Sequence, residues 1–196
     1  MASDVDICNS ALNMIGASNI VALTENSRAG RVCNQRYEFV RDAVFRAHPW
    51  NCLIKRTSLA ADSDTPAFEF SYQHTLPTDP YCLRVLRPQD PDTTFRIEGR
   101  KVLSNATPFK MIYVARVTDP NEYDQLLIEA LATRLAADIS YALVNSAALT
   151  QSLFAMYEGK LSEARFVDAT EGTPDNVINV DRTTYVESDM FISSRF

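Results

Sequence analysis

The sequence has two histidines, His48 and His74, that could act as catalytic bases. A nucleophilic triad needs a histidine beside a serine or cysteine and a carboxylate, and the sequence leaves that arrangement open. Each histidine also has a structural interpretation. His48 ends a predicted helix, where a cation favours the negative end of the helix dipole, and His74 lies in a strand-like run. We therefore predict that neither histidine is catalytic.

Paired carboxylates are a second route to chemistry, because glycan cleavage needs only two acids at the right separation. Acidic residues are plentiful, so their number alone indicates nothing. Glu129, in an alanine-rich predicted helix, is the acid to test first. We favour its interpretation as an exposed or interface acid, and the sequence thus predicts no catalytic residue.

Metal and cofactor sites have no clear sequence signal. The four cysteines, Cys8, Cys33, Cys52 and Cys82, include no Cys-x-x-Cys pair, so a zinc site is not expected. We expect all four to be reduced thiols. The five glycines are isolated from one another, and none lies in a phosphate-binding motif. The sequence predicts no metal and no cofactor.

Composition indicates a globular protein of one domain or one domain with an appendage. The chain has 196 residues, of which 46% are hydrophobic and 22% are charged. Its net charge of −6 argues against a protein whose main function is to bind nucleic acid. We expect neither a signal peptide nor a membrane segment, since no stretch approaches the roughly 18 apolar residues of a membrane helix.

Helical periodicity predicts four helices, over residues 4–16, 27–47, 123–144 and 147–168. Ser3 is a suitable N-cap for the first helix, and Gly16 is a natural residue at its end. Trp50 follows the second helix and is expected to pack under its end. The inward positions of the second helix should be Cys33, Tyr37, Val40 and Val44.

The middle of the chain, residues 52–118, has strand-like runs separated by prolines. Glu98-Gly99-Arg100 is typical of a tight hairpin. The pattern predicts an α+β fold in which a four-helix bundle carries a small antiparallel β domain, with residues 1–170 as the body. The candidate strands are Leu53–Leu59, Phe68–His74, Cys82–Leu86, Thr94–Ile97, Lys101–Ser104 and Phe109–Val117.

Residues 171–196 begin with a linker-like stretch but then carry nine apolar side chains. An extended chain of this length reaches roughly 80 Å, whereas a body of about 170 residues spans roughly 40 Å. Such an arm can fold back as an edge strand or become ordered on a partner, and we favour the partner. The candidate partner-binding residues are Val177, Ile178, Val180, Tyr185, Val186, Met190, Phe191, Ile192 and Phe196.

Several short motifs occur along the chain in an order that is typical of one protein family. Together they resemble the head-to-tail adaptor family of tailed bacteriophages, also called tail tubular protein A in short-tailed phages. The resemblance spans residues 11–169, and its most specific part is the helix that leads into His48-Pro49-Trp50. The motifs are Ala11–Gly16, Tyr37–Asn51, Tyr72–Pro77, Arg84–Val85, Phe95–Gly99, Glu129–Ala136 and Ala164–Ala169.

The resemblance implies a structural virion protein at the head-tail junction, made and assembled in the host cytoplasm. It implies a ring of twelve subunits that docks beneath the portal, extends the DNA channel, helps retain packaged DNA and carries the tail nozzle. DNA would pass through without sequence-specific binding. Family members project C-terminal arms onto the portal, a role that falls here on the nine apolar residues of the tail.

Two other functions stay open. Relatives in short-tailed phages suggest a virion-associated peptidoglycan hydrolase or a bifunctional adaptor, although no catalytic motif here matches that activity. An unrelated cytosolic scaffold, whose tail closes its own sheet, is the third possibility. We favour the adaptor ring without enzymatic activity.

Overall fold

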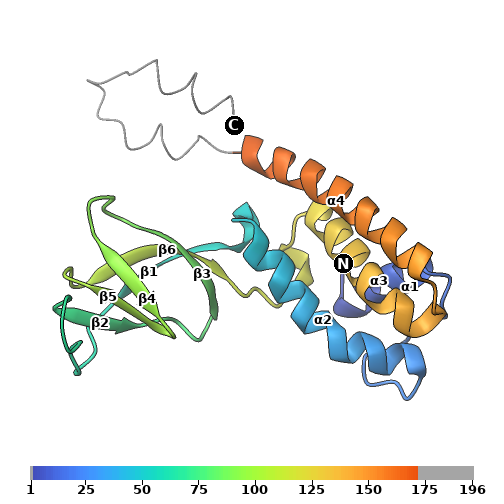
Figure 1. Ribbon diagram of the computed structural model, residues 1–196, viewed down its shortest axis with the longest axis horizontal. Helices are drawn as coiled ribbons and strands as arrows, with labels where there is room; N and C mark the ends of the chain where they lie inside the picture. The colour runs from blue at the N-terminus through green and yellow to red at the C-terminus, as the bar shows by residue number, and fades with distance from the viewer. Residues whose placement is uncertain (1, 172–196) are drawn as a thin grey trace.

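The structure is a computed structural model that describes residues 2–171. It is an α+β fold in which two small three-stranded antiparallel sheets are inserted between the second and third of four helices. In Figure 1 the helical part and the β part lie side by side. The predicted class and the place of the β insert are therefore confirmed. The nine candidate partner-binding residues of the tail, Val177 to Phe196, lie outside the described residues.

Helix α1 spans Asp4–Met14 and begins with the expected cap. The Ser3 hydroxyl accepts a hydrogen bond from the Asp6 backbone N–H, and the Asp6 carboxylate accepts one from the Ser3 N–H at 3.0 Å. Hydrogen bonds from the Ser3 hydroxyl and from the Ser3 backbone N–H to the carboxylate hold the pKa of Asp6 below its usual value. Gly16 has a φ of +70°, a left-handed conformation that glycine adopts without steric cost and that ends the helix.

Helix α2 spans Arg28–Ala47, and the Ser27 hydroxyl caps it by accepting from the Gly30 N–H. The four inward residues predicted for it are all buried. Arg41 is the one arginine of α2 that is buried, whereas the others are exposed. The Arg41 side chain is buried beside the Tyr37 ring, and its guanidinium contacts Asp42 at 3.1 Å. This burial is possible because the aliphatic part of the Arg41 side chain packs against its neighbours while the guanidinium contacts a carboxylate.

Helices α3 and α4 span Gln125–Val144 and Ala147–Thr170. The predicted start of α3 at residue 123 is two residues early, because the separate 3-10 turn η2 (Pro120–Glu122) comes first. The true N-cap is Asp124, whose carboxylate accepts from the N–H groups of Leu126 and Leu127. Between the helices, Asn145 takes a left-handed conformation with a φ of 57°.

Helix α3 is the central element of the helical part and packs against α1, α2 and α4. Small residues on several of its sides let these helices approach closely. The structure buries Ala130, Ala132, Ala136 and Ala137 in these contacts, whereas Ala142 is exposed. The guanidinium of Arg134 lies 4.6 Å from the Phe154 ring centroid, which ties α3 to α4.

The β part contains two sheets, whereas the sequence predicted one. Its first sheet has the order β1-β6-β3 and its second the order β2-β5-β4, with every pairing antiparallel. Gly99, with a φ of +58°, makes the expected hairpin turn between β4 and β5. Their bounds are β1 Ile54–Leu59, β2 Tyr72–Thr75, β3 Cys82–Pro88, β4 Phe95–Glu98, β5 Lys101–Ser104 and β6 Phe109–Ala115, preceded by the 3-10 turn η1 at Asn51–Leu53.

The two sheets share one aromatic contact zone. The Phe109 ring of β6 lies 5.6 Å from the ring centroid of His74 in β2 and 5.8 Å from that of Phe95 in β4. These contacts join residues of both sheets into one core, where aromatic packing contributes more than the buried area alone. His74 is thus a core residue of the β part.

Some apolar side chains of the β part and of α4 lie on the surface. Phe68, expected to begin a strand, is 80% exposed, because β2 begins only at Tyr72. On α4, Met156 is 40% exposed, whereas Leu153 and Ala164 are buried. Within residues 2–171, no helix combines the length and the apolar character needed to cross a membrane.

Candidate functional site: the junction of helices α2 and α4

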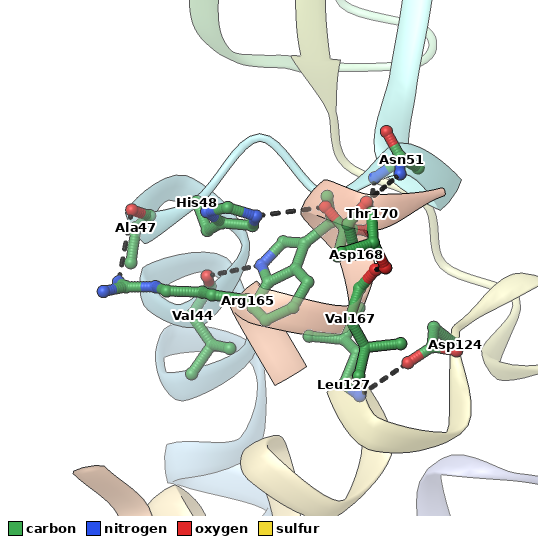
Figure 2. A network of polar contacts seen from close by, with 11 residues as sticks. Val44, Ala47, His48, Asn51, Asp124, Leu127, Arg165, Val167, Asp168 and Thr170 are labelled. Carbon is green, nitrogen blue, oxygen red and sulfur yellow. Dashed lines mark hydrogen bonds and ion pairs between the residues drawn. The ribbon is translucent and has the colours of Figure 1, made fainter. Parts of the chain in front are cut away.

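The carboxylate of Asp168, near the end of α4, joins that helix to the segment that follows α2. One oxygen of Asp168 lies 3.0 Å from His48 Nε2, and the other accepts from the Asn51 backbone N–H at 2.9 Å. The Asn51 side-chain amide donates in turn to the Asp168 carbonyl oxygen at 2.7 Å. Figure 2 shows this network, in which three hydrogen bonds hold the end of α4 in place.

The local sequence explains why His48 and Asn51 lie where Asp168 can reach them. The residue before a proline avoids the α conformation, and His48 is extended with a ψ of 147°. The chain therefore leaves α2, and Trp50 turns back beneath the helix end. Its indole Nε1 donates to the Val44 carbonyl at 3.1 Å, and its ring contacts the His48 ring edge-to-face at 4.7 Å.

The Asp168 carboxylate is largely closed to solvent, although Asn51 beside it is exposed. The side chain of Asp168 is 7% exposed and that of His48 is 18% exposed. A buried carboxylate is costly unless it is hydrogen-bonded or paired, and Asp168 has both kinds of partner when His48 is protonated. Arg165, one turn earlier on α4, adds a contact from its guanidinium to the Ala47 carbonyl. These contacts therefore hold the end of α4 next to η1.

The same residues could be considered a catalytic group, since a histidine, a carboxylate and a cysteine lie near one another. Cys52 directly follows Asn51, and burial raises the pKa of its thiol. A nucleophilic cysteine needs the opposite shift, toward the thiolate. The His48–Asp168 pair thus holds two chain segments together, and the raised pKa of Cys52 does not favour a nucleophilic thiolate.

The other candidate residues also have structural partners. The ring of His74 is fully buried, with Nδ1 3.0 Å from the Ala60 carbonyl oxygen and Nε2 3.1 Å from that of Ala106. Glu129 forms an ion pair with Lys160 of α4 at 2.9 Å, and its partner is therefore a cation rather than a second carboxylate. His74 is thus a core residue, whereas Glu129 belongs to a partly exposed ion pair between α3 and α4.

The cysteines do not form a disulfide. All four are free, and Cys8 and Cys33 lie together between α1 and α2. Their mutual hydrogen bond and burial raise the pKa of the Cys8 thiol. Among the described residues, no group of three or more histidine, cysteine, aspartate or glutamate side chains is arranged to hold a metal ion.

A second cluster, which the sequence did not predict, joins the β part to α2. Two guanidinium groups stack on the Tyr81 ring, that of Arg100 at 4.0 Å from the ring centroid and that of Arg116 at 4.4 Å. Arg116 also pairs with Asp42 of α2, and Arg100 donates to the Pro77 carbonyl at 2.6 Å. These arginines border a hollow of about 370 Å³, and among the described residues the buried Nε of Arg116 has no hydrogen-bond partner.

The sequence did not predict the anchoring role of Asp168, although the segments that form the anchor were already identified as motifs. His48 and Asn51 belong to one of the motifs that carried the family resemblance, and Asp168 belongs to another. Nothing local indicates that these motifs touch, because 117 residues separate Asn51 from Asp168. The structure brings the two motifs together.

Comparison with known proteins adds no relative from which a function could be transferred. None of the protein-family models matches the chain. No curated protein has a matching sequence.

Proposed function

We propose that this chain is a structural virion protein, a head-to-tail adaptor whose copies form a ring between the capsid portal and the tail nozzle. In this proposal the ring extends the DNA channel and helps retain packaged DNA, which passes without sequence-specific binding. The four helices act as a bundle that builds the ring. Residues 172–196 act as an extended arm that becomes ordered on the portal.

The observation that carries the proposal is the anchor at Asp168. Two motifs of the adaptor resemblance, the one ending at Asn51 and the one containing Asp168, contact each other through hydrogen bonds of 2.7 and 2.9 Å. A chance resemblance of separate short motifs has no reason to place them in one network. The contact therefore supports a shared architecture over the whole helical part.

The anchor also suits a subunit that carries a binding arm. If the arm begins at a fixed helix end, force on the arm is transmitted to the body of the subunit. If the helix end were frayed, the same force would unwind the helix. Many arms that bind one portal together convert a modest affinity of each into strong avidity. The acidic excess of the chain, a net charge of −6, disfavours tight contact with DNA phosphates in a channel.

The arm is tested with the purified portal ring of the same phage. A chain that lacks residues 172–196 should lose portal binding, and so should a full-length chain with serine at the nine apolar arm positions. The second variant keeps the length and the charges, so it isolates the apolar contacts. Undiminished binding of both variants refutes the role of the arm.

The ring and the absence of a reaction have separate tests. Low-resolution images of the portal complex should show a closed ring of this chain beneath the portal. A zymogram on peptidoglycan should show no clearing by the wild-type chain, with Glu129→Gln as its matched control. Clearing that is lost in Glu129→Gln would favour the hydrolase.

A further inference from the structure

The hollow of about 370 Å³ beside Tyr81, the Tyr81 hollow, lies where the end of α2 meets the β part. It is lined by the last turn of α2, strand β3, the turn between β4 and β5 and the residue after β6. Strand β3 packs against α2 here (Figure 1). The volume falls within the range of sites for small molecules. The described residues that line the hollow include no acid but four arginines, which are Arg46, Arg84, Arg100 and Arg116.

Little negative charge balances these four arginines. Among the described residues, Asp42 is the only carboxylate that forms an ion pair with one of them, and its partner is Arg116. Asp42 also contacts the guanidinium of Arg41 at 3.1 Å, so one acid serves two cations. The Tyr81 hollow therefore has a positive charge that the described residues do not neutralise.

The other three guanidinium groups bond to backbone carbonyl oxygens. Arg46 donates to the Leu83 carbonyl, and Arg100 donates to three carbonyls, of which that of Pro77 is nearest at 2.6 Å. Among the described residues, Arg84 has one hydrogen bond, a long contact of 3.5 Å to the Arg46 carbonyl. A carbonyl oxygen carries no net charge, and each guanidinium has five N–H donors. Donors and charge therefore remain for a ligand.

Arg116 shows most clearly that a partner is missing. Its Nε is buried and has no hydrogen-bond partner among the described residues, which costs free energy. The Tyr81 ring offsets part of this cost, because its centroid lies 4.4 Å from the Arg116 guanidinium and 4.0 Å from that of Arg100. An anion in the adjoining hollow would stabilise the remaining charge without having to reach Nε.

The arrangement favours a phosphate group over a carboxylate. A carboxylate has two oxygens and one charge, whereas a phosphate ester group has three strong acceptor oxygens and up to two charges. Guanidinium groups bond to phosphate through paired donors, and here they come from several elements of the fold. Ile97, which is 44% exposed, lies in the same wall and would contact the organic part of a phosphate ester.

We propose that the Tyr81 hollow binds a phosphate group, with Arg46, Arg84 and Arg100 as its hydrogen-bond donors and the Arg116 charge as a further attraction. The group belongs to a small phosphate compound or to the backbone of DNA, and the recognition chemistry is the same for both. This inference goes beyond the adaptor function and does not depend on it, because the site lies within one subunit.

The test is calorimetric titration of the full chain with inorganic phosphate in a chloride buffer. The wild-type chain should bind phosphate, and Arg84→Gln and Arg46→Gln should each weaken the affinity about tenfold, because each removes a charged donor. Both arginines are exposed, so the variants should fold, which circular dichroism checks. Absence of phosphate binding by the wild-type chain, or an unchanged affinity in both variants, overturns the inference.

Arg56→Gln is the matched control, because it removes the same charge from an exposed position on β1. That strand lies at the opposite edge of the sheet from β3, and Arg56 does not line the Tyr81 hollow. The variant should keep the wild-type affinity. A loss as large as that of Arg84→Gln would show a general effect of net charge and contradict a site at Tyr81.

A short duplex DNA at the same ionic strength identifies the source of the phosphate group. If the DNA competes with inorganic phosphate, and Arg84→Gln weakens the binding of both, the ligand is a backbone phosphate. If inorganic phosphate binds and the DNA does not compete, the ligand is a small phosphate compound. Either result supports the phosphate site. A chain that binds phosphate but not the portal contradicts the adaptor function alone.

Discussion

His48 Nε2 lies 3.0 Å from Asp168 Oδ2, although 120 positions separate the two residues in the chain. The contact joins the residue that ends α2 to the last turns of α4. Between these points the chain builds both sheets and the central helix α3. The pair therefore joins the end of α2 to the end of α4 at the point where the chain enters the β part. Its loss should affect the whole fold.

Asp168→Ala should lower the free energy of unfolding by about 3 kcal/mol, because it leaves His48 and the Asn51 N–H without their shared, largely buried acceptor. Asp168→Asn should cost less, since its amide oxygen can still accept from Asn51. Urea unfolding followed by circular dichroism measures both. Glu163→Ala, an exposed acid on the same helix, is the control. A loss for Asp168→Ala as small as that of the control would contradict the anchor.

Two substitutions of Trp50 distinguish the contribution of packing to stability from that of hydrogen bonding at the same junction. Trp50→Ala should lower the free energy of unfolding by about 4 kcal/mol, because the fully buried ring leaves a cavity. Trp50→Phe keeps most of the volume but leaves the Val44 carbonyl without its donor, which should cost about 1 kcal/mol. Equal losses in the two variants, again from urea unfolding, would show that volume is unimportant there.

The helices could be predicted from sequence because their signals are local. The cap at Ser3, the turn at Gly16 and the stop before Pro49 each depend on residues within one or two turns of the helix. The strand segments were also largely predictable. Lys101–Ser104 has the predicted bounds, and the turn at Gly99 lies where its residue types indicate.

The rest depends on contacts between distant residues. Division into two sheets requires β1 and β3 to pair with β6 rather than with their neighbours in sequence, and composition does not encode that choice. Burial of Arg41 depends on the elements packed around α2. The anchor requires two motifs to meet across more than 100 residues. The nine arm residues stay a prediction from composition and resemblance.

Acid should weaken the β part through Asp62. A hydrogen bond from the Lys101 ammonium group lowers the pKa of Asp62, with further help from Thr75. A carboxyl whose pKa is lower in the folded state stabilises the fold above its unfolded pKa, near 3.8, and this contribution disappears as pH falls through the folded pKa. The melting temperature should therefore fall between about pH 5 and pH 2.

Asp62→Asn should reduce that acid dependence, because the variant has no carboxyl to protonate. Asp64→Asn, two residues away and exposed, should keep the wild-type profile. Melting curves at matched ionic strength measure the three proteins. Identical acid profiles for wild type and Asp62→Asn would rule out this carboxyl as a source of the dependence.

Cys52 reports whether the junction opens locally. Burial raises the pKa of its thiol, so a thiol-specific disulfide reagent should react slowly with it in the folded protein. Asp168→Ala releases the neighbouring Asn51, and the reaction at Cys52 should accelerate about tenfold for each 1.4 kcal/mol by which local opening becomes easier. Cys82 is buried in β3 away from the junction and should accelerate less than Cys52 if the junction also opens locally. A larger acceleration at Cys52 than at Cys82 would identify local opening of the junction, whereas equal acceleration at both cysteines would show that they react only through global unfolding and would contradict local opening.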